Sequence, residues 1–377
     1  MTRLSILHTE SSCGWGGQEL RIISEAEGFR RRGHTVCIAA PREARIFAEA
    51  GRRGLAALAL PIAKKRAGGI LALRRELASR RWEVVNTHSS TDSWLVALAL
   101  AALPATQAVP LVRTRHISAP ISRSAATRWL YGSATAHVVT TGEALRRQVI
   151  DEAGLDAGRV TSVPTGIDLE RFCPGDRAQA RTQTGLPAGR FVVGIVATLR
   201  SWKGHRVLVE AIAALKDERA MLVIVGDGPG RDNLREQVRS LGLGGSVLMP
   251  GNQDDVVPWL RAFDLFVLPS YANEGVPQAI MQAMACACPV ITTPVGSIGE
   301  IVEDGQSGLM AKPRDTAALA ATIRRLRDDP GLRSRLGQAA LDVARQRFAQ
   351  DIMLDRMEAI FLAVVPGGRL PVGGAKA

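Results

Sequence analysis

The chain has 377 residues, more than a single hydrophobic core usually serves, so two domains are expected. Hydrophobic residues make up 46% of the chain and aromatic residues only 4%, which excludes a disordered chain and favours alternating strands and helices over a β-sandwich. The net charge is +12, and residues 1–170 carry most of it, with 23 Lys and Arg against 15 Asp and Glu.

The first half of the chain alternates between apolar strand-like runs and helical stretches. It begins with strand 4–8 (LSILH), a glycine-rich loop and a helix from Glu19 to Arg32, which Gly33 ends. The predicted elements that follow are strand 34–40, helix 68–80, strand 83–88, helix 92–102, strand 109–116 and strand 136–141. Strands that alternate with helices of this length predict right-handed βαβ units and a parallel sheet.

A second alternating series begins at Phe191, after the Pro- and Gly-punctuated segment 161–176, which is predicted to link two domains. Its predicted elements are strand 191–197, helix 205–215, strand 220–226, a helix ending near Leu241, strand 246–251, helix 256–261, strand 265–270, helix 277–287 and strand 289–294. Residues 316–362 are predicted to be mostly helical, and 363–377 to form a flexible tail. The fold class that follows is α/β, with two doubly wound domains.

The five cysteines are odd in number and lack Cys-x-x-Cys or zinc-ligand spacing, so a reduced, cytoplasmic protein is expected. Cys286 and Cys288 are either small core residues or a redox or metal-binding pair, and core packing is favoured. The start of the chain shows no signal-peptide pattern. The longest apolar run, Trp94–Leu103, is about half as long as a membrane-spanning helix.

Basic clusters recur in the first half, including Arg30–Arg32 and Lys64–Arg66. Such clusters either contact anionic membrane headgroups or form a solvated face, and both interpretations stay open. Aromatic residues do not interleave with them as they do in nucleic-acid binders, so nucleic acid is not an expected partner.

Ligands bind at the carboxyl ends of strands in open parallel sheets, and several predicted strands here end in glycine or histidine. Gly16 and Gly17 lie in the loop after strand 4–8, where glycines allow positive φ and a close approach of the backbone to a ligand. A tight strand-to-helix turn would use the same glycines. His88 and His116 end two strands, where each would either bind a sugar hydroxyl or serve the structure alone.

Two cations, Arg200 and Lys203, follow strand 191–197 and precede a helix. A guanidinium fork and an ammonium charge at this place would form a pocket for a diphosphate, with two solvent-exposed cations as the alternative. The segment GDGPG (226–230) is neither a dinucleotide-binding fingerprint nor a Walker A loop. Hydride transfer and ATP hydrolysis therefore lose their main support.

The segment EGVPQAIMQ (274–282) places a carboxylate directly before a Gly and a helix-starting Pro. The N–H groups of Gly275 and Val276 would be free to bind a phosphate above the helix start. Glu274 would accept hydrogen bonds from sugar hydroxyls, and Gln282, just over two turns later, would lie on the same helix face. An acidic complement to the helix dipole is the alternative for Glu274.

With these motifs in this order, the chain resembles the retaining glycosyltransferases of family 4, which have the GT-B fold of two Rossmann-like domains facing a central cleft. The resemblance is strongest over 264–313 (DLFVLPSYANEGVPQAIMQAMACACPVITTPVGSIGEIVEDGQSGLMAKP). It extends through RSWKG (200–204), VGDGPG (225–230), VPTGID (163–168) and the amino-terminal glycine loop. It therefore covers nearly the whole chain.

The resemblance implies an acceptor-binding domain over 1–168, to which a helix at 347–362 returns, and a nucleotide-sugar-binding domain over 169–346. In the family the donor diphosphate contacts the positions matched by Arg200, Lys203, Gly275 and Val276. Glu274 matches the family's catalytic acid, which binds hydroxyls of the donor sugar.

Three further positions follow from the resemblance. Gln282 stands where the family has a second Glu that binds the ribose, and its amide would make a weaker, uncharged contact. Gly16 and Gly17 match the glycine loop, and His116 matches the histidine near the donor sugar, which makes it a second candidate catalytic residue.

The implied activity is transfer of a sugar, with retention, from a UDP- or GDP-linked donor to a lipid-linked or saccharide acceptor in lipopolysaccharide or other cell-envelope glycan synthesis. No cofactor and no metal are expected, since the chain contains no Asp-x-Asp motif. The basic first domain predicts peripheral contact with the anionic inner face of the cytoplasmic membrane. A nucleotide-sugar epimerase or hydrolase of the same fold, or an impaired homologue acting as a scaffold, are the alternatives.

Overall fold

The computed structural model describes residues 2–79, 81–272 and 274–366. The chain divides into two compact units, one of Met1–Gly166 with Gln350–Ala377 and the other of Ile167–Ala349. These boundaries lie within three residues of the 168/169 and 346/347 boundaries expected from the sequence. Each unit has its own parallel sheet and its own hydrophobic core.

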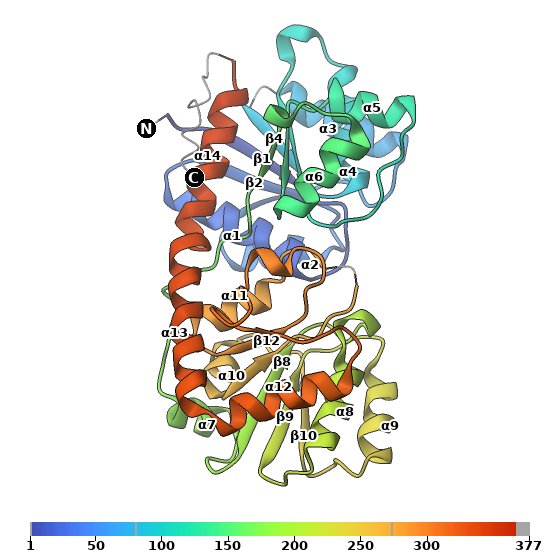
Figure 1. The fold of residues 1–377 in the computed structure, drawn as a ribbon. Helices are drawn as coiled ribbons and strands as arrows, with labels where there is room; N and C mark the ends of the chain where they lie inside the picture. Colours follow the sequence, from blue (N-terminus) through green and yellow to red (C-terminus); the bar gives the residue numbers. More distant parts are fainter. Residues whose placement is uncertain (1, 80, 273, 367–377) are drawn as a thin grey trace. The chain divides into compact units, whose positions relative to one another are not determined.

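The first unit contains a seven-stranded parallel sheet in the order β3-β2-β1-β4-β5-β6-β7 (Figure 1). Its strands are β1 (Ser5–Thr9), β2 (Thr35–Ala40), β3 (Ala56–Ala59), β4 (Val84–Thr87), β5 (Leu111–Arg115), β6 (His137–Thr140) and β7 (Val160–Ser162). The strand order reverses between β1 and β4, which pair directly. Residues that follow β1 and β4 therefore meet at the switch point, where such sheets bind ligands, and residues that follow the neighbouring β5 lie beside them.

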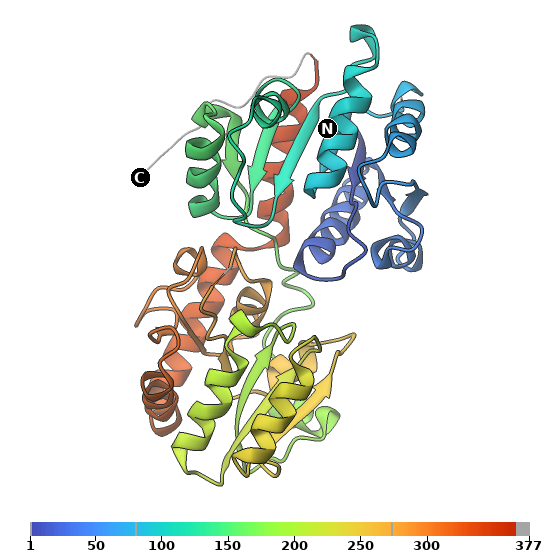
Figure 2. The ribbon, with the colours of Figure 1, turned by 90° about the vertical axis from the view of Figure 1, so that its right-hand side faces the viewer.

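Helices cover both faces of this sheet (Figure 2). They are α1 (Gly17–Arg31), α2 (Arg45–Arg52), α3 (Ala67–Ala78), α4 (Ser90–Ala101), α5 (Ala125–Gly132), α6 (Glu143–Ala153) and α14 (Gln350–Val364). Successive strand residues point to opposite faces, so Ile6 packs in the cluster with α1, α2 and α14, and Leu7 in the cluster with α3 and α4. Burial on both faces explains the consecutive apolar residues in these strands, such as Val84 and Val85 in β4 and Leu111 and Val112 in β5.

The last helix, α14, packs on α1 in the first unit. A Cβ on Gly28 would overlap the side chain of Leu354, so the glycine allows the two helices to approach closely. Beside this contact Arg32 forms ion pairs with Asp355 (2.7 Å) and Glu358 (3.0 Å) of α14. The predicted flexible tail 363–377 begins inside α14, and its part from 367 onward lies outside the described residues.

The basic triplet Arg30–Arg32 is engaged within the protein. Its first two residues donate to the carbonyl of Gly54 (2.6 Å) and to the side-chain oxygen of Gln350 (2.7 Å), and the third pairs with α14. The triplet is therefore a poor candidate for the expected membrane contact, whereas Lys64–Arg66 is exposed.

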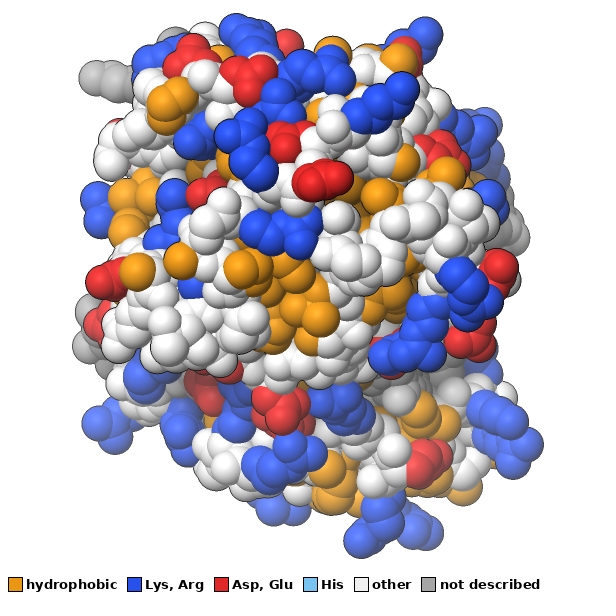
Figure 3. Space-filling model, turned by 90° about the horizontal axis from the view of Figure 1, so that it is seen from below, with side chains coloured by type: hydrophobic (Ala, Val, Ile, Leu, Met, Phe, Trp, Pro, Cys, Tyr) orange, Lys and Arg blue, Asp and Glu red, His pale blue; other side chains and the backbone are white. Residues whose placement is uncertain are grey.

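On the face shown in Figure 3, Lys and Arg side chains are scattered, with Asp and Glu between them. Among the described residues, no helix is long and apolar enough to cross a membrane.

The second unit contains a six-stranded parallel sheet in the order β10-β9-β8-β11-β12-β13. Its strands are β8 (Phe191–Val196), β9 (Ala220–Val225), β10 (Val247–Gly251), β11 (Leu265–Val267), β12 (Val290–Thr292) and β13 (Leu309–Met310). Its helices are α7 (Arg177–Thr184), α8 (His205–Leu215), α9 (Arg231–Ser240), α10 (Val257–Ala262), α11 (Gln278–Ala285), α12 (Thr316–Asp328) and α13 (Pro330–Arg347). The strand order reverses between β8 and β11, which defines a second switch point.

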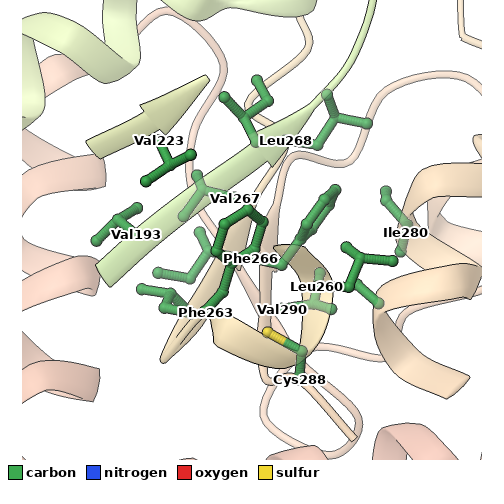
Figure 4. Packing of buried hydrophobic residues seen from close by; sticks show 14 of the residues in the cluster. Val193, Val223, Leu260, Phe263, Phe266, Val267, Leu268, Ile280, Cys288 and Val290 are labelled. Carbon is green, nitrogen blue, oxygen red and sulfur yellow. The ribbon is translucent and has the colours of Figure 1, made fainter. Parts of the chain in front are cut away.

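The core of the second unit is densely packed around β8 and β11 (Figure 4). A Cβ on Gly194 of β8 would overlap the ring of Phe263, so the glycine makes room for the aromatic side chain. Cys286 and Cys288 are buried in this core, and burial raises the pKa of the Cys286 thiol to about 12 and that of Cys288 further. Both thiols stay protonated and pack as small apolar groups.

The segment predicted as the link, 161–176, begins inside the sheet because β7 ends at Ser162. The chain leaves the first unit after Gly166, where a Cβ would lie 2.6 Å from the Cα of Gln350 at the start of α14. The chain leaves the first unit after Gly166 and returns to it at Gln350, and a glycine is required because these two segments lie side by side.

Candidate active site

Loops that follow β8 and β11 form the carboxyl edge of the second sheet. After β8, Arg200 leads into a short 3-10 helix, Ser201–Lys203, and Gly204 turns the chain into α8 with a φ of 76°. A Cβ on Gly204 would overlap the carbonyl oxygen of Pro269, which lies in the loop after β11. This close approach, possible only for glycine, sets Lys203 beside the segment that carries Glu274.

Lys203 and Glu274 form a two-pronged ion pair. The Lys203 Nζ lies 2.7 Å and 2.8 Å from the two carboxylate oxygens of Glu274, and the hydroxyl of Ser270 donates to the same carboxylate at 2.5 Å. Glu274 is only 5% exposed. A carboxylate buried this far requires a paired cation and further hydrogen bonds, and Lys203 and Ser270 supply them.

The loop after β12 packs against the backbone of Glu274 from another side. Gly296 has a φ of 60°, and a Cβ there would overlap the carbonyl oxygen of Glu274. The hydroxyl of Thr293 donates to the carbonyl of Ser270. The sequence analysis did not identify Ser270, Thr293 or Gly296, and the glycine that follows strand 289–294 was the one available signal.

Helix α11 begins directly after this segment. Pro277 is its N-cap residue, with a φ of −69°, and thus stands one position earlier than predicted. Gly275 is half-buried and Val276 buried just before the helix start. The half-buried side chain of Gln282 makes no hydrogen bond to another residue in the described part of the chain, so its amide is free for a ligand.

Arg200 is exposed, and its guanidinium lies 5.7 Å from the centre of the Trp202 ring. Among the described residues no carboxylate pairs with it. The glycines of GDGPG pack under this loop, since a Cβ on Gly228 would lie 2.8 Å from the backbone nitrogen of Leu199. The glycine motif therefore shapes the segment that holds Arg200.

The glycine loop of the first unit lies between β1 and α1. Gly16 is the N-cap of α1 with a φ of −170°, an extended conformation that any residue adopts, and Gly17 is the first helical residue. The prediction that these glycines serve to reach positive φ is therefore wrong. In the same loop, burial and the nearby Asp92 raise the pKa of the Glu10 carboxyl to about 8, and the side chain of Gln18 donates to it.

The two histidines singled out in the sequence meet at the carboxyl edge of the first sheet. The Nδ1 of His88 lies 3.0 Å from the Nε2 of His116, and the Nε2 of His88 lies 3.0 Å from the Nδ1 of His8 at the end of β1. Sequence reasoning missed His8, whose place at the end of strand LSILH was the available signal. Burial lowers the pKa of His88 and His116 well below the ordinary value, and that of His8 to about 3, so all three are neutral at pH 7.

Comparison with solved structures identifies the fold of the protein. A glycosyltransferase from Rickettsia africae superposes with a TM-score of 0.87 at 20% identity, covering 97% of this chain and all of that one. The Anabaena HepE protein in complex with UDP and glucose gives 0.82 at 23% identity, covering 95% of this chain and 99% of its own. The predicted fold class is confirmed as GT-B, with two Rossmann-like α/β units.

Sequence comparison defines the family. The model for Glycosyltransferase Family 4 matches residues 15–171, and the model for Glycosyl transferases group 1 matches 176–343. D-inositol 3-phosphate glycosyltransferase 1 of Catenulispora acidiphila is 31% identical over 76% of this chain and 74% of its own length. The relative from Salinispora arenicola is 32% identical over 72% and 67%. The chain belongs to these glycosyltransferase families, and the prediction of a glycosyltransferase enzyme is confirmed.

Proposed function

We propose that the protein transfers a sugar from a nucleotide-diphosphate-sugar to an acceptor hydroxyl, with retention at the anomeric carbon. The observation that carries this proposal is the Lys203–Glu274 pair, set beside the exposed Arg200 at the switch point of the second sheet. A donor of this kind presents a charged diphosphate next to a polyhydroxyl ring. Two cations and a carboxylate on one sheet edge provide a binding group for each part.

In this proposal Arg200, Lys203 and the N–H groups of Gly275 and Val276 bind the diphosphate, and Glu274 accepts hydrogen bonds from sugar hydroxyls. Negative charge grows on the leaving diphosphate as its bond to the anomeric carbon breaks, and the fixed cations stabilise that charge. The acceptor oxygen bonds to the same face of the anomeric carbon, and its proton passes to a diphosphate oxygen. No step requires a general base from the protein.

A uridine diphosphate donor is proposed over a guanosine one. The support is that HepE has been solved with UDP, with UDP-glucose, and with UDP and glucose. The free amide of Gln282 would contact the ribose. Calorimetric titration with UDP and GDP tests this choice: UDP should bind more tightly, and tighter binding of GDP would reverse the assignment.

A phosphate-bearing polyol is proposed as the acceptor. The names of the relatives, which specify D-inositol 3-phosphate, support it, and so does the excess of Lys and Arg in the first unit. The lipid-linked or lipopolysaccharide acceptor implied by the resemblance is the alternative, with Lys64–Arg66 as the membrane contact. A cytoplasmic location with peripheral membrane contact stays a prediction.

A donor and acceptor panel tests the proposal. The purified protein is incubated with labelled UDP- and GDP-sugars, with and without inositol 3-phosphate or a lipid-linked saccharide in anionic vesicles. Transfer should require an acceptor, leave the anomeric configuration unchanged by NMR, and persist in EDTA because Arg200 and Lys203 balance the diphosphate charge. Conversion of the donor without an acceptor would instead indicate an epimerase or hydrolase, and no thermal stabilisation by any donor would indicate a scaffold.

A further inference from the structure

Three imidazoles form a continuous hydrogen-bonded chain across the ends of β1, β4 and β5. His8 and His88 have ring centroids 5.3 Å apart, and His88 and His116 are also 5.3 Å apart, with nitrogens 3.0 Å apart at each junction. His8 and His88 are buried, whereas His116 is half-buried. The chain of three histidines thus leads from the interior of the first unit to the half-buried His116.

The protons of three neutral imidazoles joined by hydrogen bonds can be arranged in only two orders, one inward and one outward. Each ring carries one N–H and one lone pair, and each junction needs one donor, so the tautomer of one ring fixes the other two. In the inward order His116 donates through Nε2, His88 donates through Nε2, and the Nε2–H of His8 is left without an acceptor. In the outward order His8 and His88 donate through Nδ1, and His116 holds its proton on Nδ1.

The surroundings of His8, at the buried end of the three-histidine chain, determine which of the two proton orders is more stable. The Nε2 of His8 is buried without a hydrogen-bond partner among the described residues, and the nearby Arg21 is fully buried. An N–H on His8 Nε2 would be a buried donor without an acceptor, and it would lie near a guanidinium charge. A lone pair there is attracted by that charge and is complementary to the Arg21 N–H. The outward order is therefore the stable one.

The other groups around Arg21 preserve this effect. Its guanidinium donates to the carbonyl of Val163 at 2.7 Å, which fixes its place. Glu25 lies 3.5 Å from the Arg21 Nε, but burial raises the pKa of this carboxyl, and Arg21 is the neighbouring charge that lowers the pKa of His8. The ring of Phe361 packs edge-on against His8.

We propose that Arg21 and His8, acting through His88, are positioning residues that hold His116 as a neutral imidazole with its proton on Nδ1. His116 then offers a hydrogen-bond donor to a sugar or acceptor oxygen and cannot accept a proton at that atom. This role at a substrate rests on the proposed sugar transfer. The proton order itself is a property of the first unit alone.

NMR of the full-length protein labelled with ¹⁵N-histidine reads the proton order directly. At pH 7.5, His8, His88 and His116 should each show a protonated Nδ1 and an unprotonated Nε2, the tautomer that free imidazole side chains disfavour in water. The protein has three other histidines, His34, His137 and His205. Single substitutions of these residues assign their signals and leave the remaining three for His8, His88 and His116. A protonated Nε2 on His88 or His116 would overturn the proposal.

A pair of variants tests the coupling. His8→Leu removes the last donor, so His116 should shift towards the Nε2–H tautomer and kcat should fall about fivefold to tenfold, the effect of one hydrogen bond, with the KM for the donor unchanged. His8→Asn places an amide N–H where Nδ1–H stood and should restore both readouts. The matched control His137→Gln, in a buried histidine that contacts Thr161, should change neither.

The outcomes separate this inference from the proposed function. Activity with a protonated Nε2 on His116 removes the inference and leaves the transferase proposal intact. The outward order in a protein that transfers no sugar removes the proposed function instead. If His8→Leu fails to fold, the spectrum of the unchanged protein still decides the proton order.

Discussion

The two sheet edges of this protein are built on opposite electrostatic principles. At the edge of the second unit, Lys203 and Glu274 form an ion pair at 2.7 Å. At the edge of the first unit, His8, His88 and His116 are neutral, and the ring nitrogen that holds the proton determines where each can donate a hydrogen bond. A charged ligand can take over a partner in an ion pair, whereas a neutral chain is suited to orienting a single donor towards an oxygen.

The largest effect is expected at the charged edge, from Glu274→Ala. Loss of the carboxylate that binds donor-sugar hydroxyls should lower transfer by at least about a hundredfold in a donor–acceptor assay. The sequence alone predicted little change in stability, because Glu274 was expected to face the cleft. The buried pair changes that expectation: leaving Lys203 unpaired should lower the free energy of unfolding by about 1–3 kcal/mol in urea denaturation.

Glu274→Gln is the matched control. The amide keeps the shape and can still accept from Ser270, so it should retain more stability than Ala while losing most of the transfer activity. A Gln variant that transfers sugar at the normal rate would show that the charge of Glu274 contributes only to folding.

A smaller effect is expected from Lys203→Ala. Removal of one of the two diphosphate cations should weaken UDP binding by about tenfold to a hundredfold in calorimetric titration. Lys203→Arg keeps the charge and should recover part of the affinity. Unchanged UDP affinity in the Ala variant would mean that Lys203 serves the ion pair with Glu274 and not the ligand.

The sequence predicted most of the architecture because many of the buried strands are apolar runs, such as FVVGIV in β8 and AMLVIV in β9. The predicted helix 205–215 has the same bounds as α8, since Gly204 precedes it and the apolar face is regular. Sequence reasoning missed the helices α2, α5, α6 and α7. It also missed short or weakly patterned strands, such as β3, whose AALA has low strand propensity, and β13, which has two residues. Their pairing depends on neighbours far away in the chain.

The candidate site was predicted residue by residue, but its internal contacts were not. Lys203 and Glu274 were assigned to separate parts of the donor, and nothing in their spacing of 71 positions shows that they form an ion pair. His8 was missed because its contact with His88 spans 80 positions and depends on the order in which the strands are arranged. Such contacts follow from sheet topology, which local patterns do not contain.

At the sheet edge of the first unit, Glu10 should make the free energy of unfolding depend on pH. The folded pKa of Glu10 is about 8 against an ordinary 4.5, so between these values the folded state holds a proton that the unfolded state has released. Stability should therefore fall as pH rises through this range. His8, with a lowered pKa, acts in the opposite direction, and its effect fades about one pH unit above the ordinary value of 6.5.

Urea midpoints between pH 7.5 and 8.5 measure the contribution of Glu10 with little effect from the histidines, because unfolded histidines are largely deprotonated above pH 7.5. The slope should reach about 1 kcal/mol per pH unit, and Glu10→Gln should flatten it. Glu49→Gln is the matched control, because Arg53 holds the pKa of Glu49 below its ordinary value and the residue does not titrate in this window. An equal slope in the Glu10 variant would mean that this carboxyl is already ionised in the folded protein.

The smallest effect returns to the charged edge, at Gln282. Its amide makes no hydrogen bond to another described residue, and Gln282→Glu would give the ribose a charged acceptor in its place. Because a charge-assisted hydrogen bond is roughly twice as strong as a neutral one, UDP affinity should rise about threefold to tenfold in calorimetric titration. Gln282→Ala should lower affinity by a similar factor with an unchanged thermal midpoint, since the side chain is half-buried and unpaired. Opposite signs for Glu and Ala would place the residue on the nucleotide, whereas equal, small losses from both would show that the ribose is bound elsewhere.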